Sequence, residues 1–225
     1  MLAIILGSGL SKFSNHFEII EKTSFSEFLN IEYQPINGHL REIHIAKYNG
    51  KEFVIISGRL HYYEGYSFAQ ISKPLAFSIQ KHGIKKFIIT SICGALAKHI
   101  KIGEWVDIDT VVALPTVCQA VIQQSNTKTT KGNTYAFHQG PSYGTLSEYK
   151  MMHYLGASTI GMSVLPEAKY LKEKGVHFEI KTLPICQYFP FDTLCEPCHE
   201  EVLDIANLGV EKLVTKIKTT LNNIK

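Results

Sequence analysis

Residues 57–66, with the sequence SGRLHYYEGY, combine several side chains that can do chemistry. Arg59, His61 and Glu64 lie between two glycines, directly after the apolar run at residues 53–56. An arginine presents a planar fork that suits phosphate, and a histidine can donate a hydrogen bond or carry a proton near neutral pH. Ligands of open α/β folds bind beyond the carboxyl ends of strands, so a site is expected where this strand ends. The alternative is an edge loop whose aromatic rings pack and whose charges are solvated.

Two further apolar runs end in small residues. Residues 2–6 lead into Gly7-Ser8-Gly9, and residues 86–90 lead into Ser91-Ile92-Cys93-Gly94. Glycine permits positive φ and close backbone approach, so a strand followed by Gly-Ser-Gly can form a nest of N–H groups around an anion. A plain tight turn is the alternative. In the second run, a ligand could lie against backbone N–H groups.

The elements that must position these residues alternate between strands and helices. Apolar and β-branched runs predict strands at residues 2–6, 18–23, 42–47, 53–56, 86–90, 106–114, 134–138, 159–162 and 178–183. Helical spacing predicts helices at residues 68–82, 146–154, 167–174 and 199–224. Asn49-Gly50 predicts a hairpin turn, and the polar residues 115–133 predict a loop. The pattern is typical of an α/β fold in a single domain, residues 1–225.

Composition limits the classes of protein. The 225 residues are 45% hydrophobic and 19% charged, which fits a globular domain with a sizeable core. The net charge is +3 with scattered lysines, which does not point to nucleic acid. The five cysteines lack the spacing of a disulfide framework, which favours a reduced cytoplasmic setting. We expect no metal and no membrane segment, and the start MLAIILGSGL lacks the basic flank of a signal peptide.

Four separated motifs carry a resemblance to a known family. They are Gly7-Ser8-Gly9-Leu10, GRLHYYEGY at residues 58–66, GMSVLPE at residues 161–167, and His199-Glu200-Glu201-Val202. In this order and spacing the set resembles the trimeric purine nucleoside phosphorylases and their methylthioadenosine phosphorylase relatives. Gly140-Pro141-Ser142-Tyr143 also matches that family, and the resemblance covers nearly the whole chain. It implies an α/β fold with a mixed, partly barrel-like β-sheet flanked by α-helices, assembled as a homotrimer.

The resemblance also implies a reaction. The family consists of pentosyltransferases in which phosphate attacks the anomeric carbon of a purine-type nucleoside and releases free base and (deoxy)ribose 1-phosphate. The expected partners are a nucleoside and inorganic phosphate as co-substrate, with no cofactor, in cytoplasmic nucleoside salvage. Such a reaction needs a held phosphate, an oriented sugar and a stabilised leaving base.

Site residues carry over from the family position by position. The implied phosphate contacts are Ser8, Arg59, His61, Ser163 and the backbone N–H of Ile92. The implied ribose contacts are Tyr63, Met162 and His199. His61, Glu64 and Cys186 stand at the implied catalytic positions. The implied base pocket comprises Ser91, Cys93, Tyr143, Gly144 and Cys186. His39 matches a loop histidine near the phosphate, and Tyr135 matches an aromatic position near the sugar.

The base pocket departs from the family pattern. Gly144 replaces a glutamate that accepts from the base, and Cys186 replaces an asparagine that bonds the purine ring. Ser91, Ile92 and Cys93 replace Asn-Ala-Ala, and the bulkier side chains narrow the pocket. Residues 115–133 are also shorter than the family's gate region, which puts a contribution from a neighbouring subunit in question.

These departures leave two hypotheses. In the first, the chain is a phosphorylase with atypical base specificity, whose replacement base contacts come from Gln187, Ser91, Tyr143 or Asp192. In the second, it is a degenerate homologue that binds phosphate or sugar phosphate with little or no turnover. Phosphate-dependent release of base separates the two.

Overall fold

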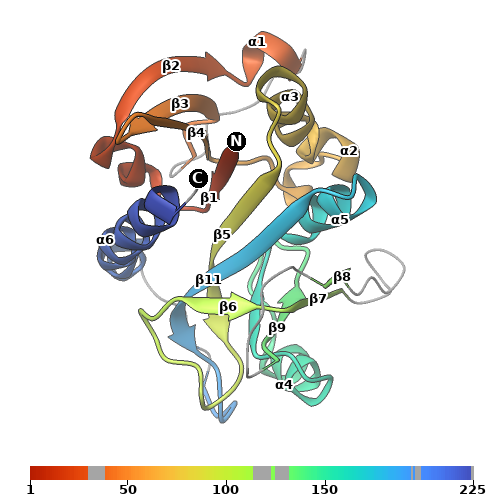
Figure 1. The fold of residues 1–225 in the computed structure, drawn as a ribbon. Coiled ribbons are helices and arrows are strands. Elements are labelled where there is room, and N and C mark those ends of the chain that lie inside the picture. Colours follow the sequence, from red (N-terminus) through yellow and green to blue (C-terminus); the bar gives the residue numbers. More distant parts are fainter. Residues whose placement is uncertain (30–38, 114–122, 125–131, 194, 196–198, 224–225) are drawn as a thin grey trace.

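The computed structural model describes the chain outside residues 30–38, 114–122, 125–131, 194, 196–198 and 224–225. In the described part, eleven strands form one mixed sheet with helices packed on both sides of its central strands (Figure 1). The predicted α/β class with a mixed sheet is confirmed. No helix among the described residues is long and apolar enough to cross a membrane.

The bounds of the elements follow the chain. The strands are β1 Leu2–Leu6, β2 Glu18–Ser24, β3 Glu42–Tyr48, β4 Lys51–Ser57, β5 Lys86–Ala95, β6 Val106–Ile108, β7 Thr110–Ala113, β8 Gln123–Gln124, β9 Thr134–Phe137, β10 Thr159–Gly161 and β11 His177–Gln187. The helices are α1 Ser26–Leu29, α2 Phe68–Ile71, α3 Lys73–His82, α4 Leu146–Tyr154, α5 Leu165–Glu173 and α6 His199–Asn223. Two 3₁₀ turns are η1 Ser11–His16 and η2 Tyr62–Glu64.

Strand β5 is the centre of the sheet. The strand order is β2-β3-β4-β1-β5-β10-β9-β7-β8, and β11 pairs with both β5 and β6. The strands β4, β1, β5 and β11 are parallel to one another. Residues 86–89 of β5 pair with β1, whereas residues 94–95 pair with β10. The second half of β5 therefore extends past the carboxyl end of β1, where a ligand site of an open α/β sheet is expected.

Strand β1 is buried on both faces, and its residues alternate between two parts of the core. Leu2, Ile4 and Leu6 belong to one cluster, which α6 completes with apolar side chains such as Leu213. The intervening Ala3 and Ile5 belong to the opposite cluster, with side chains from α3 and α5. Side chains of a strand point alternately to the two faces, so a continuous apolar run suits a strand between two helical layers (Figure 1).

The predicted hairpin at Asn49-Gly50 is confirmed. Strands β3 and β4 pair antiparallel up to Tyr48 and Lys51. Asn49 and Gly50 both have positive φ, at 48° and 75°. Two such residues form the turn whose twist matches a tight hairpin, and asparagine and glycine tolerate it best.

The single helix predicted at residues 68–82 is wrong, because the structure divides it at Ser72. Helix α2 ends there and α3 starts at Lys73, with Pro74 in its first turn. Proline lacks an N–H and its ring collides with the preceding turn, so it begins a helix more readily than it continues one.

Three strand predictions also differ from the structure. The strand predicted to end at Thr90 continues to Ala95, so Ser91, Ile92 and Cys93 lie in β5 and not in a turn. The strand predicted at residues 178–183 extends to Gln187. The run at residues 106–114 is two strands, β6 and β7, with residue 114 outside the described residues, and the predicted loop at 115–133 contains the short β8.

Candidate active site

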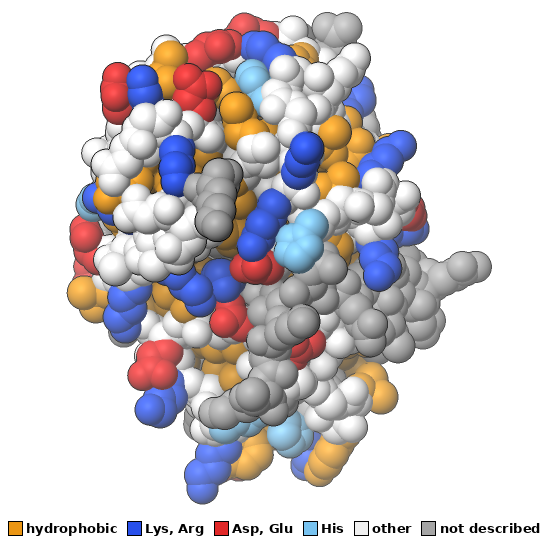
Figure 2. Space-filling model, viewed as in Figure 1, with side chains coloured by type: hydrophobic (Ala, Val, Ile, Leu, Met, Phe, Trp, Pro, Cys, Tyr) orange, Lys and Arg blue, Asp and Glu red, His pale blue; other side chains and the backbone are white. Residues whose placement is uncertain are grey.

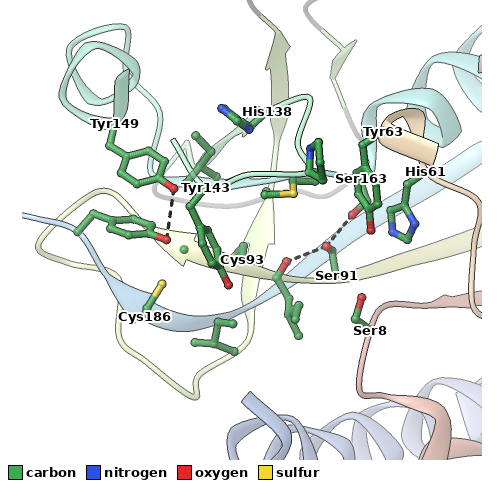
Figure 3. A pocket seen from close by; sticks show the side chains of 18 residues that line it. Ser8, His61, Tyr63, Ser91, Cys93, His138, Tyr143, Tyr149, Ser163 and Cys186 are labelled. Carbon is green, nitrogen blue, oxygen red and sulfur yellow. Dashed lines mark hydrogen bonds between the residues drawn. The ribbon is translucent and has the colours of Figure 1, made fainter. Parts of the chain in front are cut away.

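A cavity of about 260 Å³ lies against the second half of β5. Most of the residues that the sequence proposed for a site line it. They are Ser8, His61, Tyr63, Ser91, Ile92, Cys93, Tyr143, Met162, Ser163 and Cys186. Figure 3 shows Ser8, His61 and Ser163 at one end and Tyr149 and Cys186 at the other. We name these the serine end, with Ser8, His61, Ser91 and Ser163, and the tyrosine end, with Tyr149, Ile185, Cys186 and Tyr188.

The guanidinium of Arg59 lies behind the serine end. Its Nη1 donates to Ser163 Oγ at 3.2 Å, and its Nη2 donates to the carbonyl of Thr90 at 3.0 Å. Ser163 Oγ is also 2.8 Å from Ser91 Oγ. Arg59 is buried and is not among the residues that line the cavity, so its charge reaches the cavity through the two serines.

A buried carboxylate holds this guanidinium. Glu167 Oε1 lies 2.8 Å from Arg59 Nε, and both side chains are almost completely buried. The contact is an ion pair whose angle falls outside hydrogen-bond geometry, since neither atom has a hydrogen-bond partner among the described residues. Two buried charges require such a partner, because each is costly to remove from water alone.

The backbone turns sharply between Ser163 and α5. Val164 has a φ of 74°, in the left-handed region that a β-branched residue rarely adopts. A strained residue of this kind persists only where its surroundings hold it, and such residues cluster at functional sites. Here the turn lies between Ser163, which lines the cavity, and the helix that carries Glu167.

His39 supports Ser8 at the same end. The backbone N–H of Arg59 donates to His39 Nδ1 at 3.2 Å, so Nδ1 carries no proton. The proton is therefore on Nε2, which donates to Ser8 Oγ at 2.9 Å. Burial, with His61, Arg59 and Arg41 nearby, lowers the pKa of His39 to about 2. The imidazole is neutral, and the Ser8 O–H is left to donate elsewhere.

His61 is held by a carboxylate that does not line the cavity. Glu64 Oε1 accepts from the His61 backbone N–H at 2.9 Å and lies 2.8 Å from His61 Nδ1. The buried Arg41 pairs with the other oxygen of Glu64. Burial lowers the pKa of His61, although its hydrogen bond to Glu64 opposes that effect. At neutral pH the ring therefore keeps its proton on Nδ1 and presents Nε2 as an acceptor.

The residues proposed for the sugar have different positions. Tyr63 stacks on His61 with ring centroids 4.7 Å apart, and Met162 lines the cavity beside it. Tyr135 is fully buried, and its hydroxyl accepts from the Ser163 backbone N–H at 3.3 Å, so it supports the site from behind. The side chain of His199, at the start of α6, lies outside the described residues.

Two tyrosines of the tyrosine end were missed by sequence reasoning. The hydroxyl of Tyr149 accepts from the Gly144 backbone N–H at 2.8 Å and donates to the Tyr188 hydroxyl at 3.4 Å. The two rings stack with centroids 4.0 Å apart. A sequence signal existed, because Tyr188 follows Cys186 by two residues, the spacing of side chains on one face of a strand.

The thiols at this end are neutral. Burial raises the pKa of Cys93 and that of Cys186 to about 12. A thiol is a nucleophile only as its thiolate, so the geometry gives Cys186 the role of a weak hydrogen-bonding wall.

Two of the proposed replacement base contacts lie elsewhere. Gln187 is not among the cavity-lining residues, and its side chain bonds the carbonyls of Ala97 and Ile100 and the N–H of Phe189. Asp192 is exposed and does not line the cavity. Ser91 lines the serine end, beside Ser163. Gly144 is behind the tyrosine end, where its N–H anchors Tyr149.

Comparison with known proteins gives consistent relatives. The chain is 23% identical to the purine nucleoside phosphorylase of Mus musculus over 99% of this chain and 89% of that protein. It is 23% identical to purine nucleoside phosphorylase 1 of Geobacillus stearothermophilus over 99% of this chain and 91% of that protein. It resembles the structure of purine nucleoside phosphorylase isoform 2 from Schistosoma mansoni in complex with cytosine and ribose-1-phosphate, with a TM-score of 0.81 and 22% identity over 100% of this chain and 90% of that chain. That likeness shows the shared fold.

A family model decides the membership. The model described as the Phosphorylase superfamily matches residues 2–125, more than half of the chain. The matched part includes the Gly7-Ser8-Gly9 turn and the SGRLHYYEGY segment, both of which contribute to the serine end. The resemblance stated from the motifs is therefore confirmed, and the chain belongs to the phosphorylase superfamily.

Proposed function

We propose that this protein is a nucleoside phosphorylase, a pentosyltransferase that converts a purine-type nucleoside and phosphate to free base and (deoxy)ribose 1-phosphate. One observation carries the proposal. A buried guanidinium, that of Arg59, stands behind Ser163 at the end of the cavity that Ser8 and His61 also line. Such an arrangement suits an oxyanion such as phosphate, because charge and hydroxyl donors converge on one place.

The serine end has the donors that phosphate requires. The Ser8 O–H is not used by His39, and Ser163 and Ser91 add two hydroxyls. Each terminal nitrogen of Arg59 carries a second N–H besides the one already bonded. Held by these groups, phosphate would be close to the sugar and prepaid for the loss of motional freedom, which is a large part of the barrier to a two-substrate reaction.

His61 supplies an acceptor for a proton of phosphate. Its Nδ1–H is bonded to Glu64, so Nε2 is available to accept from a protonated phosphate oxygen. Phosphate at neutral pH is a mixture of the monoanion and the dianion, and the dianion is the better nucleophile. We assign His61 a binding role for the attacking group and Glu64 the role of positioning residue.

The geometry also supports a place for the sugar and the base. Tyr63 and Met162 line the cavity beside His61, and the tyrosine end lies beyond them. A nucleoside whose anomeric carbon faces the serine end would then direct its base toward the tyrosine end. His199 remains a proposed ribose contact by resemblance only.

A second candidate function has its own observation. Among the described residues that line the cavity, none carries a carboxylate or carboxamide. A leaving base without such a partner is stabilised less, which favours a protein that binds phosphate or sugar phosphate with little turnover.

The direct test incubates the purified protein with a panel of purine and pyrimidine nucleosides, with and without phosphate. Chromatography then measures released base and pentose 1-phosphate. We expect release of base that depends on phosphate and is matched by pentose 1-phosphate. Binding of phosphate without release from any nucleoside would support the second candidate, and release without phosphate would identify a hydrolase.

A variant of the serine end tests the observation on which the proposal rests. Ser163→Ala removes the hydroxyl that links Arg59 to the cavity, so the KM for phosphate should rise roughly 10-fold, as expected for one lost charge-assisted hydrogen bond. Ser78→Ala is the matched control, because Ser78 is a fully buried serine that bonds the carbonyl of Pro74 inside α3. An unchanged KM for phosphate in Ser163→Ala would contradict the assignment.

The assembly is proposed on the same resemblance. We propose a homotrimer, and exposed apolar side chains support self-association, since Tyr154 and Leu155 at the end of α4 are 76% and 59% exposed. On the face drawn in Figure 2, charged side chains of both signs are mixed, so charge repulsion does not oppose association there. Light scattering of the purified protein measures the mass directly, and a monomer would contradict the proposal.

A further inference from the structure

The tyrosine end offers hydroxyl groups where a nucleobase would lie. Figure 3 shows Tyr149 and Cys186 far from Ser8 and His61. The walls around them are apolar or weakly polar, with Ile92, Cys93 and Ile185 among the lining residues. In the described part of the chain, the polar groups of this end are the hydroxyls of Tyr149 and Tyr188 and the neutral thiol of Cys186.

The hydrogen bonds at this end run in one direction. A backbone N–H can only donate, so Tyr149 must accept from Gly144 and use its own proton toward Tyr188. The Tyr188 oxygen therefore accepts from Tyr149, and its own proton is directed to another group. Besides a bound ligand, that group is the Cys186 thiol, whose sulfur is a weak acceptor. The chain of bonds ends in a hydroxyl donor at the cavity wall.

Two glycines make room for this pair. A Cβ added at Gly94 would lie 2.3 Å from Tyr188 Cε2, and one added at Gly144 would lie 2.8 Å from Tyr149 Cε1. Any side chain at either position would displace a ring. Position 144 therefore cannot carry a carboxylate while Tyr149 is in place, and Tyr149 in turn holds Tyr188 through stacking and its hydroxyl. The pair is a built part of the cavity.

We propose that Tyr188 is the specificity-determining residue for the base, that its O–H donates to an acceptor on the base edge, and that the site selects 6-aminopurine nucleosides over guanosine. The proposal rests on the proposed function and deepens it. In a 6-aminopurine, N1 is an unprotonated acceptor, and the neighbouring amino group can donate to a phenol oxygen. In guanine, N1–H and the 2-amino group bring donors to the same edge.

The physical reason is the cost of unpaired donors. The described lining residues of this end have no carboxylate or amide oxygen to receive two N–H groups of guanine. Burial raises the pKa of Tyr149 and that of Tyr188, so neither becomes a phenolate acceptor at neutral pH. A site that leaves polar groups of a bound substrate unpaired discriminates against that substrate by factors well above those of a lost methylene, on the order of 100-fold or more.

The test compares kcat/KM for adenosine and guanosine at saturating phosphate in the wild type and in Tyr188→Phe. Phenylalanine keeps the ring that stacks on Tyr149 and removes only the hydroxyl. We expect the wild type to prefer adenosine by at least about 10-fold, and Tyr188→Phe to lose roughly 10- to 100-fold on adenosine while guanosine changes less than about 3-fold. Tyr170→Phe, a partly exposed tyrosine of α5 outside the cavity, should change neither substrate. Thermal melting confirms that both variants fold.

The outcomes separate this inference from the proposed function. A wild type that prefers guanosine, or a Tyr188→Phe variant that loses both substrates equally, overturns the inference and leaves phosphorolysis established. If no nucleoside gives phosphate-dependent release, equilibrium binding of adenosine and guanosine by calorimetry replaces kinetics. Tighter binding of adenosine that Tyr188→Phe abolishes would then uphold the inference without turnover. Equal binding, or no binding, would overturn it.

Discussion

At the scale of single residues, the serine end depends on buried polar groups that are matched in pairs. Arg59 faces Glu167, and Arg41 faces Glu64, so each buried guanidinium has its own carboxylate. His39 is different, since it is buried without a carboxylate and stays neutral. These residues connect stability to function, because the same side chains orient Ser8, His61 and Ser163.

Glu167→Gln should destabilise the protein strongly. The substitution leaves the Arg59 charge buried without a counter-charge, which costs about 3–5 kcal/mol of unfolding free energy. Urea unfolding measures the change, and the double variant Arg59→Met/Glu167→Leu should recover part of the loss because it removes both charges. Glu173→Gln is the control on the same helix, since that carboxylate is 60% exposed and lies 4.0 Å from Lys169. A loss as small as that of the control would refute the argument.

His39 should make the protein less stable in acid. Its pKa in the folded protein is depressed to about 2 from the usual 6.5, so the unfolded chain takes up a proton that the folded chain does not. Stability is therefore full above pH 6.5 and falls as the pH decreases below it. Between pH 7 and pH 5 this single group contributes a loss of about 2 kcal/mol.

The variant His39→Gln isolates this effect. Glutamine does not titrate, and its amide can still donate toward Ser8. Urea unfolding at pH 7 and pH 5 should therefore show a smaller acid loss in His39→Gln than in the wild type. Equal losses would mean that His39 is protonated in the folded protein.

At the scale of elements, short helices and turns present the site. Helix α4 begins at a capping box in which Thr145 Oγ1 accepts from the Glu148 N–H at 3.2 Å and Glu148 accepts from the Thr145 N–H at 2.7 Å. This helix carries Tyr149 to the cavity wall. The η2 turn does the same for Tyr63, since His61 and Glu64 close it with a second capping box.

Thr145→Ala should weaken α4. Loss of an N-cap side chain costs about 1 kcal/mol of unfolding free energy, because the N–H groups of the first turn lose a partner. Denaturant midpoints measure the change, and Thr145→Ser is the matched control, since serine retains the hydroxyl. If Thr145→Ser loses as much stability as Thr145→Ala, the cap is not the cause.

At the scale of the whole molecule, α6 closes one face of the sheet. Its apolar side chains pack on the even-numbered residues of β1, in a cluster separate from the one that α3 and α5 complete (Figure 1). Gly209 lets α6 approach β11 closely, since a Cβ there would lie 2.3 Å from Leu183 Cδ2. The carbonyl of Gly209 also accepts from Trp105 Nε1 at 2.9 Å.

Leu213→Ala should destabilise the molecule by about 2–5 kcal/mol, the usual cost of truncating a fully buried leucine. Leu213 is 1% exposed, whereas Leu208 on the same helix is 67% exposed. Leu208→Ala should therefore change the unfolding free energy by less than about 0.5 kcal/mol. Similar losses for the two variants, measured by urea unfolding, would show that α6 does not pack as described.

The sequence by itself determined the fold class, the family and the serine end. These features are local, because apolar periodicity marks the strands and a strand end followed by small or charged residues marks a ligand site. Ser8, His61 and Ser163 each lie directly after such a strand, so their motifs could be read without the structure. The turn at Asn49-Gly50 and the first-turn proline at Pro166 were local for the same reason.

Only the tertiary structure decided the tyrosine end. Tyr188 meets Gly94 because β11 runs beside β5 with a bulge between Pro184 and Cys186, which shifts the register by one residue. Such a shift turns side chains to the other face of a strand, and no local pattern announces it. Tyr149 and Tyr188 likewise meet across two elements that are distant in sequence. The sequence could therefore identify the missing carboxylate at Gly144, but only the packing of paired strands revealed the hydroxyls that stand in its place.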